Sequence, residues 1–424
     1  MRSTTKLVEL EALRGIAAIV VLIHHFMLGF APRLHGMTYG DQPYSLFGTP
    51  AFAFVNGSAA VIVFFVLSGF VLSLRVLRTG SAIDALIAAA KRWPRLAGPV
   101  MLTNVVAGAM MAAGLFRNVE TAPSVPSVWL GWFYTWPSMG WREISSSLWE
   151  GASTFVTGDS FYNSNLWTMV YEFVGSFVVL AVALLVSRLP RLRFAALGAV
   201  WLVVFLLSPY VSAFVAGVAL ALWWRECPRR DWRPWQSWLA FGVAVLLAGF
   251  DRSFVSEEPS GIYAWLTPLA SGNMQGFRVV LHTLAAALLI LLFLRSTAVR
   301  RHMSGRVGFA LGYLSFGIYL SQVVVICSVA SVVFSGTASW GHVPQLVATF
   351  AATASATLIL AIPVAAFDHW WVRRVGAWTD KAMSALSRRV PGAKAYEPGP
   401  PFPVSTDRVD RATRRPTIEP AAPG

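Results

Sequence analysis

Ten apolar stretches dominate the sequence, and most of them are long enough to cross a lipid bilayer as a helix. A spanning helix needs about 20 apolar residues. Hydrophobic residues make up 56% of the 424 residues and charged residues 13%, which is about half the charged share of a soluble domain. In a bilayer each segment must satisfy its own backbone groups, and this favours helices. The sequence therefore predicts an all-α transmembrane bundle of ten spans. The stretches are 11–30, 51–77, 96–116, 166–187, 194–208, 209–224, 236–250, 279–294, 307–334 and 345–371.

Proline and chain composition divide the predicted bundle from its tail. The stretch 194–224 is interpreted as two helices separated at Ser208-Pro209, because the residue before proline disfavours a helix; one broken span is the alternative. The first run lacks the features of a cleaved signal peptide, so we expect a retained helix. Residues 1–375 form the membrane domain in this prediction. Residues 376–424, proline-rich after Val390, form a mostly disordered cytoplasmic tail.

Basic residues gather in alternate loops. Sixteen Arg and Lys residues follow the second, fourth, sixth and eighth stretches, whereas the other loops hold five. Short cytoplasmic loops collect Lys and Arg, so both termini are predicted to be cytoplasmic. This topology accounts for the net charge of +14, and no nucleic-acid partner is needed to explain it.

Few features of the sequence point to a cofactor. Cys227 and Cys327 are too few for a disulfide framework or a metal cluster, so neither a metal nor a tightly bound cofactor is predicted. The segment 117–165 is rich in Trp, Ser and Pro. Its aromatic residues are interpreted as interfacial anchors in preference to substrate contacts.

One face of the first helix carries two ionisable residues. Arg14 and His25 are 11 residues apart, which places them within about 20° of each other and about 16 Å apart along the axis. Glu11 lies one turn before Arg14 and is expected to pair with it. His24 is rotated away, towards lipid or a neighbouring helix. Snorkelling of Arg14 and packing of His25 are the simpler alternative, but ionisable residues in spans usually mark function.

Further polar residues are expected near Arg14, at the cytoplasmic surface. Ser68 and Gly69 lie in "FFVLSGF" near the end of the second span, and the loop "KRWPRLAGP" then supplies Arg92 and Arg95. A Ser-Gly pair is most often a helix-packing contact. The basic cluster is most often a topology signal. Both alternatives stay open at this point.

Other polar residues are expected at the depth of His25, in the outer half. Glu172 of "NLWTMVYEF" lies about two turns below the outer surface if the fourth span begins there. Tyr319 and Gln322 reach a similar depth in the ninth span. A carboxylate inside a span is seldom kept without a partner or a task, so Glu172 is expected to orient His25 or to bind substrate.

These motifs resemble one known family. "LEALRGIAAIVVLIHHF", "FFVLSGF", "KRWPRLAGP", "NLWTMVYEF" and "LGYLSFGIYL" follow one another in the order seen in the acyltransferase 3 family of bacterial integral-membrane O-acyltransferases. The resemblance covers about residues 7 to 372. It implies a ten-span enzyme of the bacterial inner membrane. Such an enzyme takes an acyl group, commonly acetyl, from cytoplasmic acyl-CoA and delivers it to a hydroxyl of a carbohydrate or glycosylated acceptor, often at the outer face.

The resemblance also implies roles for particular residues. His25 is similar to the catalytic histidine, Arg14 to its required partner and Glu172 to the acid of the fourth motif. The CoA end is then expected at Arg92 and Arg95, with Ser68 and Gly69 beside them. Acceptor contacts are expected from Trp167, Tyr319 and Gln322.

Two positions depart from the family pattern. Gln322 stands where relatives often have His, which removes a proton-carrying role but leaves hydrogen bonding. Thr168 replaces the usual Ser. Many relatives also carry a C-terminal esterase-like domain, so this chain is expected to act alone or with a separate extracytoplasmic partner protein.

A chemical role for His25 follows from imidazole itself. A neutral imidazole near pH 7 is suited to remove the proton of an acceptor hydroxyl; an acyl-histidine relay is the alternative. A proton-coupled transporter or flippase is the rival class, since intramembrane Arg, His and Glu also serve carriers. No second copy of the Arg-x10-His element is found in the later spans. A scaffold would leave the shared face of Arg14 and His25 unexplained.

The charge asymmetry predicts which loops face each side. A single cysteine placed at Ser81 should react with an impermeant thiol reagent only from the cytoplasmic side. One placed at Ser124 should react only from the outer side. Labelling of sealed vesicles of both orientations, in a background without Cys227 and Cys327, measures this. Reaction of both positions from one side would contradict the ten-span topology.

Overall fold

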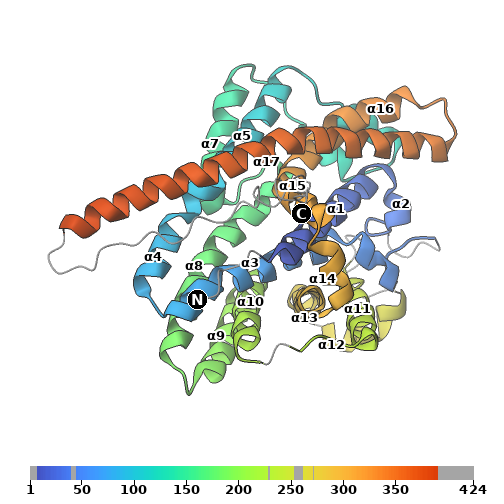
Figure 1. Ribbon diagram of the computed structural model, residues 1–424. Helices are drawn as coiled ribbons and strands as arrows, with labels where there is room; N and C mark the ends of the chain where they lie inside the picture. The colour runs from blue at the N-terminus through green and yellow to red at the C-terminus, as the bar shows by residue number, and fades with distance from the viewer. Residues whose placement is uncertain (1–6, 40–43, 228–229, 253–260, 271, 390–424) are drawn as a thin grey trace, which may run out of the picture. The chain divides into compact units, whose positions relative to one another are not determined.

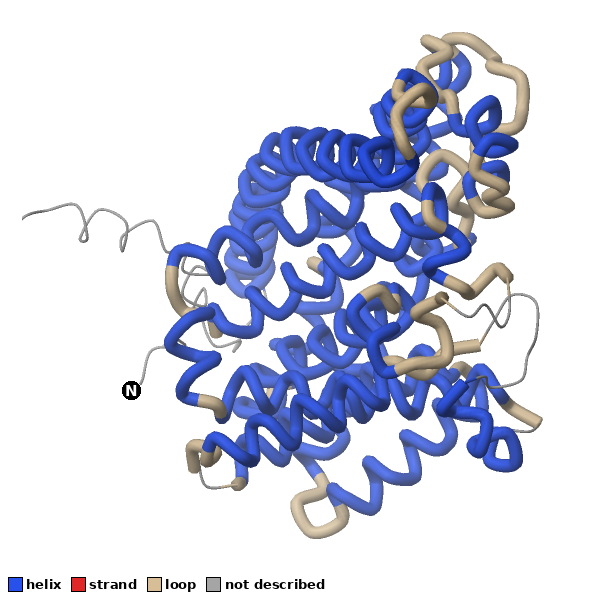
Figure 2. Tube along the Cα trace, turned by 90° about the vertical axis from the view of Figure 1, so that its right-hand side faces the viewer, coloured by secondary structure: helices blue, strands red, loops and turns tan. Residues whose placement is uncertain are grey.

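Every regular element of the computed structural model is a helix in the part that it describes, residues 7–39, 44–227, 230–252, 261–270 and 272–389 (Figures 1 and 2). The predicted all-α fold is confirmed. The α-helices are α1 Val8–Phe30, α2 Pro32–His35, α3 Gly57–Thr79, α4 Ala82–Ala90, α5 Arg92–Ala112, α6 Asn118–Thr121, α7 Arg142–Thr157, α8 Trp167–Arg188, α9 Arg193–Leu207, α10 Pro209–Glu226, α11 Pro234–Ala248, α12 Thr267–Ala270, α13 Met274–Arg295, α14 Thr297–Met303, α15 Arg306–Val325, α16 Ser331–Gly336 and α17 His342–Arg389. Short 3-10 turns are η1 Pro50–Phe54, η2 Ala122–Ser124, η3 Leu130–Trp132, η4 Ser164–Leu166 and η5 Gly261–Leu266, and η6 Ile326–Ala330 is a π-helical turn.

Seven helical stretches of the described part are long and apolar enough to cross a membrane. Two shorter apolar helices, α9 and α11, have 15 residues each, and α10 has 18. Each of the ten predicted stretches overlaps one of these helices. The number that cross the membrane and the side of the termini stay predictions. The seven stretches are Val8–Phe30, Gly57–Thr79, Ala82–Ala112, Ser164–Arg188, Met274–Arg295, Arg306–Gly336 and His342–Ser384.

The predicted helix break at Ser208 is confirmed. The helix α9 ends at Leu207, Ser208 is extended, and α10 begins at Pro209. Proline suits the first position of a helix because the N–H that it lacks has no partner there. The chain therefore turns between two separate helices at this point.

Glycines hold α1 against α15. The helix α1 lies among α3, α13 and α15. A Cβ at Gly15 would lie 2.4 Å from the Leu311 carbonyl oxygen, and one at Gly312 would lie 2.5 Å from the Cβ of Glu11. Small residues let helix backbones approach closely in membranes. This contact brings the helix with Arg14 and His25 beside the helix that carries Gln322.

Glycines also hold α3 against α10. A Cβ at Gly69 would lie 2.1 Å from the carbonyl oxygen of Phe214, and one at Gly217 would lie 2.3 Å from that of Val66. Helix packing is therefore sufficient to explain the glycine at position 69, the simpler of its two interpretations.

A segment between α5 and α7 folds onto the end of α1. The helices α5 and α7 lie side by side (Figure 1). The segment that connects them contributes Trp129 and Leu130 to a buried cluster with Phe30 of α1 and Ile326 of η6. This segment closes one end of the bundle, next to His25.

The chain divides into two compact units. One is residues 8–376, which holds all the features discussed below, and the described residues 377–389 belong to the other. The tail was predicted to begin at residue 376 and to be mostly disordered. Residues 376–389 continue α17 as a helix, and residues 390–424 lie outside the described part, so the disorder of the tail stays a prediction.

Candidate active site

His25 is the more accessible of the two histidines near the end of α1. It is partly accessible to solvent, whereas His24 is buried. The helix is continuous from Val8 to Phe30, so the predicted shared face of Arg14 and His25 is retained over the three turns between them.

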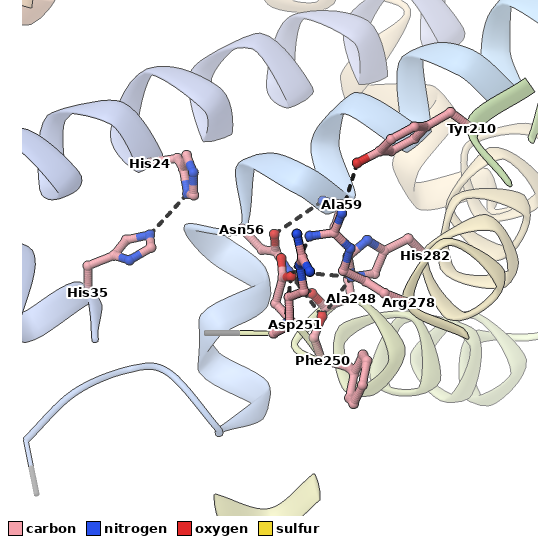
Figure 3. Close-up of polar contacts among 11 residues, drawn as sticks. His24, His35, Asn56, Ala59, Tyr210, Ala248, Phe250, Asp251, Arg278 and His282 are labelled. Atoms are coloured by element: carbon pink, nitrogen blue, oxygen red, sulfur yellow. Dashed lines mark hydrogen bonds and ion pairs between the residues drawn. The ribbon is translucent and has the colours of Figure 1, made fainter. Parts of the chain in front are cut away.

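His24 points into the bundle. Its Nδ1 lies 2.9 Å from the Val55 carbonyl oxygen and 3.0 Å from Nε2 of His35 (Figure 3). A carbonyl oxygen only accepts hydrogen bonds, so Nδ1 of His24 carries the proton. A Cβ at Gly57 would lie 2.6 Å from the His24 ring. Of the two expected surroundings, a neighbouring helix is right and lipid is wrong.

His25 stacks on a tryptophan from the segment after α5. Its ring lies 5.1 Å from the Trp129 ring, centroid to centroid, with 13° between the planes. Gln322 interacts with the same imidazole from α15. Nδ1 of His25 and Oε1 of Gln322 are both buried and have no hydrogen-bond partner among the described residues. Buried polar atoms are normally paired, so these two atoms are candidates to bind a ligand.

Hydrogen bonds fix the segment that presents Trp129. Ser127 donates from Oγ to the Leu28 carbonyl oxygen of α1 at 2.6 Å, and the Leu130 N–H donates to the same Oγ. Asn118 donates to the carbonyl oxygens of Leu130 and Phe133. Trp129 is thereby tied to the last turn of α1. Sequence reasoning missed it, because one Trp among many in 117–165 carries no distinguishing signal.

A buried ion pair joins α5 to α8. Arg92 donates from Nη2 to Glu172 at 2.6 Å and from Nε to Ser176 at 2.6 Å. Ser68 of α3 donates to the same Glu172 oxygen at 2.8 Å. Arg92 was predicted to lie in a loop, and this is wrong: Arg92 is the first residue of α5, within the helical stretch Ala82–Ala112. Its side chain is buried, with 7% of the residue exposed. The partner carboxylate makes this burial possible.

The remaining basic candidates lie around this ion pair. Arg14 pairs with Glu11 at 2.7 Å, as predicted. Arg95 is accessible to solvent and lies within electrostatic range of Arg92 and Arg14. Asp368 of α17 also acts electrostatically on Arg95, an interaction that the sequence did not indicate. Acidic and basic side chains from α1, α5, α8 and α17 thus form one charged cluster.

Glu172 belongs to this charged cluster. The sequence placed it beside His25, but its hydrogen bonds run to Arg92 and Ser68. The expected depth assumed that α8 begins at the membrane surface and that Arg92 lies outside it. The structure instead has Arg92 in the first turn of α5, where its guanidinium forms an ion pair with the Glu172 carboxylate. No hydrogen bond joins Glu172 to His25 in the described part.

The three acceptor candidates have different surroundings. Gln322 lies beside His25, as described above. Tyr319 is buried, and its hydroxyl bonds Thr168 at 2.8 Å and the Asn165 carbonyl oxygen at 3.0 Å. Trp167 lies edge-on to Tyr171 and Tyr210, with centroids 5.8 and 5.6 Å away. The structure therefore brings only Gln322 next to His25.

A second buried ion pair lies near His24, and no motif had marked it. Arg278 of α13 donates to Asp251 at 2.8 Å and to the Tyr210 hydroxyl at 2.8 Å (Figure 3). Burial alone would raise the pKa of the Asp251 carboxyl, but Arg278, His282 and the backbone N–H of Arg252 together outweigh it and lower the pKa below its usual value. Asp251 is therefore charged at neutral pH.

The buried pair of Arg92 and Glu172 should matter more for stability than a surface pair. Glu172→Gln leaves a buried guanidinium without its carboxylate, a change that costs about 3–5 kcal/mol. Glu120→Gln breaks the exposed pair Arg117–Glu120, which is worth about 0–1 kcal/mol. Thermal unfolding in detergent should show a clear fall for Glu172→Gln only. Equal melting temperatures for the two variants would contradict this role.

Comparison with known proteins identifies the family of the chain. A model of the acyltransferase 3 family, described as an acyltransferase domain, matches residues 7–365. No curated protein and no solved structure matches the chain. The match covers the described helices from α1 to the first half of α17, and both Arg14 and His25 lie within it. The chain is a multi-pass membrane protein that belongs to the acyltransferase 3 family.

Proposed function

We propose that the protein is a membrane O-acyltransferase in which His25 is the general base. The observation that carries the proposal is the environment of His25 at one end of α1. Its ring stacks on Trp129, its Nδ1 has no hydrogen-bond partner among the described residues, and Gln322 interacts with its imidazole. At the other end of the same helix, Arg14 lies within electrostatic range of Arg95.

The donor in this proposal is acyl-CoA, with acetyl as the acyl group. Arg95 and Arg14 supply positive charge for the CoA phosphates. Arg92 uses two donor groups on Ser176 and Glu172, so its part is to hold Glu172 and shape this end. Ser68 donates a hydrogen bond to Glu172, so its contribution to this end is also indirect. The thin pantetheine arm would follow α1 over the roughly 16 Å between Arg14 and His25.

The chemistry needs one proton carrier. His25 takes the proton of the acceptor hydroxyl, and the hydroxyl oxygen forms a bond to the thioester carbonyl carbon. The bond from that carbon to sulfur breaks, and the CoA thiolate takes the proton from the imidazolium. The stacked indole of Trp129 limits rotation of the ring, so its nitrogens keep one orientation. An acyl-histidine would require the same placement.

The acceptor in this proposal is a carbohydrate or glycosylated molecule at the outer face of a bacterial inner membrane. Gln322 offers an amide for a sugar hydroxyl, and Trp129 offers an aromatic ring. The hydroxyl of Tyr319 is already hydrogen-bonded to Thr168 and Asn165, so the role of Tyr319 is structural and does not include binding the acceptor. Trp167 lies in a separate aromatic group, with Tyr171 and Tyr210. A separate extracytoplasmic protein would receive the product or present the acceptor.

His25→Ala tests this proposal even while the acceptor is unidentified. Cells that lack the protein are complemented with wild type, His25→Ala or His302→Ala at matched membrane levels. Surface glycans are then analysed by mass spectrometry for an acyl increment. Loss of a general base removes about two to four powers of ten in rate, so the increment should vanish with His25→Ala. His302 is exposed on α14, and its variant should retain the increment. An unchanged increment with His25→Ala would overturn the proposal.

A further inference from the structure

Five buried or partly buried polar side chains meet at the start of α3. Asp251, Arg278 and Tyr210 form one hydrogen-bonded row. Asn56 caps α3, and its amide donates to two carbonyl oxygens at the end of α11 and just after it, those of Ala248 and Phe250. His282 lies one turn after Arg278 on α13. Figure 3 shows these residues converging from α3, α10, α13 and the end of α11.

Packing alone does not account for this group. Apolar side chains of similar volume stabilise a protein interior at least as well as a buried ion pair. The Asp251 carboxylate has no exposed surface. Oδ2 of Asp251, Nε of Arg278 and Nδ1 of His282 also lack partners in the described part of the chain. Ionisable groups at membrane depth usually have a task.

The group is connected to His24 through the backbone. His282 donates from Nε2 to the Phe250 carbonyl oxygen at 2.7 Å, and the Asn56 amide donates to the same oxygen at 3.2 Å. Asn56 follows Val55, whose carbonyl oxygen accepts from His24. His24 lies in turn 5.3 Å from His25, ring centroid to ring centroid. Asp251 follows Phe250 in the chain, so backbone connections and these hydrogen bonds link the ion pair to His24, which neighbours His25.

We propose that Asp251, Arg278, His282 and Asn56 form a positioning network, which fixes the start of α3 against His24 and sets the electrostatic field at His24, the neighbour of His25. This inference rests on the proposed function, because it concerns the same general base. None of the four residues is a catalytic residue in this account. They act on His25 through His24.

The two charges of the network act on His24 in opposite directions. Asp251 and Arg278 both lie within electrostatic range of His24. A carboxylate favours a protonated imidazole and a guanidinium disfavours it. Among the described residues, the other titratable group facing the pair is His35 of α2; Gln322 of α15 does not titrate. Burial, and then His24, hold the pKa of His35 well below its usual value, so it is neutral at pH 7.

The test is the dependence of the transfer rate on pH. Purified protein in vesicles receives labelled acetyl-CoA and the surface-glycan fraction of cells that lack the protein. A general base must be unprotonated, so the rate falls at low pH, and the midpoint of that fall reports the base. Asp251→Asn should move the midpoint to lower pH and Arg278→Gln to higher pH, each by about half a unit or more. The double variant should return close to wild type.

Two further variants separate an electrostatic effect on the midpoint from a structural effect of the substitution. Arg278→Lys keeps the charge, and Tyr210→Phe removes one contact of Arg278 without changing charge, so both should keep the wild-type midpoint even where the maximal rate falls. If Asp251→Asn fails to insert, Arg278→Gln and Arg278→Lys carry the test alone. Slower variants with an unshifted midpoint would overturn the network. Absence of wild-type transfer, or activity in His25→Ala, would instead overturn the proposed function.

Discussion

A guanidinium inside an apolar helix bundle needs a carboxylate beside it, and the pair Arg92–Glu172 meets that requirement. Charges are costly to bury unless they are paired and hydrogen-bonded. This pair joins α5 to α8, and Ser68 adds α3 through the same carboxylate. With Arg92 fixed at the start of α5, Arg95 lies one turn further along the helix, within electrostatic range of Arg14. One ion pair thus organises the charged end of α1.

The other end of α1 is organised by hydrogen bonds and close packing. Ser127 ties the Trp129 segment to the last turn of α1, and the contact of Gly15 with Leu311 brings α15 and Gln322 into place. Asn56 fixes the start of α3, against which His24 lies. Each contact involves an element far away in the sequence. A single helix therefore carries two polar sites that are built by different neighbours.

Sequence patterns were sufficient for the helices and for the face that Arg14 and His25 share, because both depend on local periodicity. They were also sufficient for the break at Ser208, since proline acts on its immediate neighbour. They were not sufficient to identify partners on other helices. The surroundings of Glu172 depend on how deep Arg92 lies, and the pair of Asp251 and Arg278 joins segments 27 residues apart. Trp129 and Asp368 reach their places through tertiary packing, which leaves no local signal.

The central claim is that the acyl end of the donor reaches His25 while its phosphates stay at the charged end of α1. A CoA thioether with a diazirine in place of the acyl group measures this directly, because it binds without transfer and labels nearby residues under light. Mass spectrometry of the labelled protein should locate the label on the peptides of His25, Trp129 or Gln322, and excess CoA should remove it. Competed labelling confined to the surroundings of Arg92 and Arg95 would contradict the account.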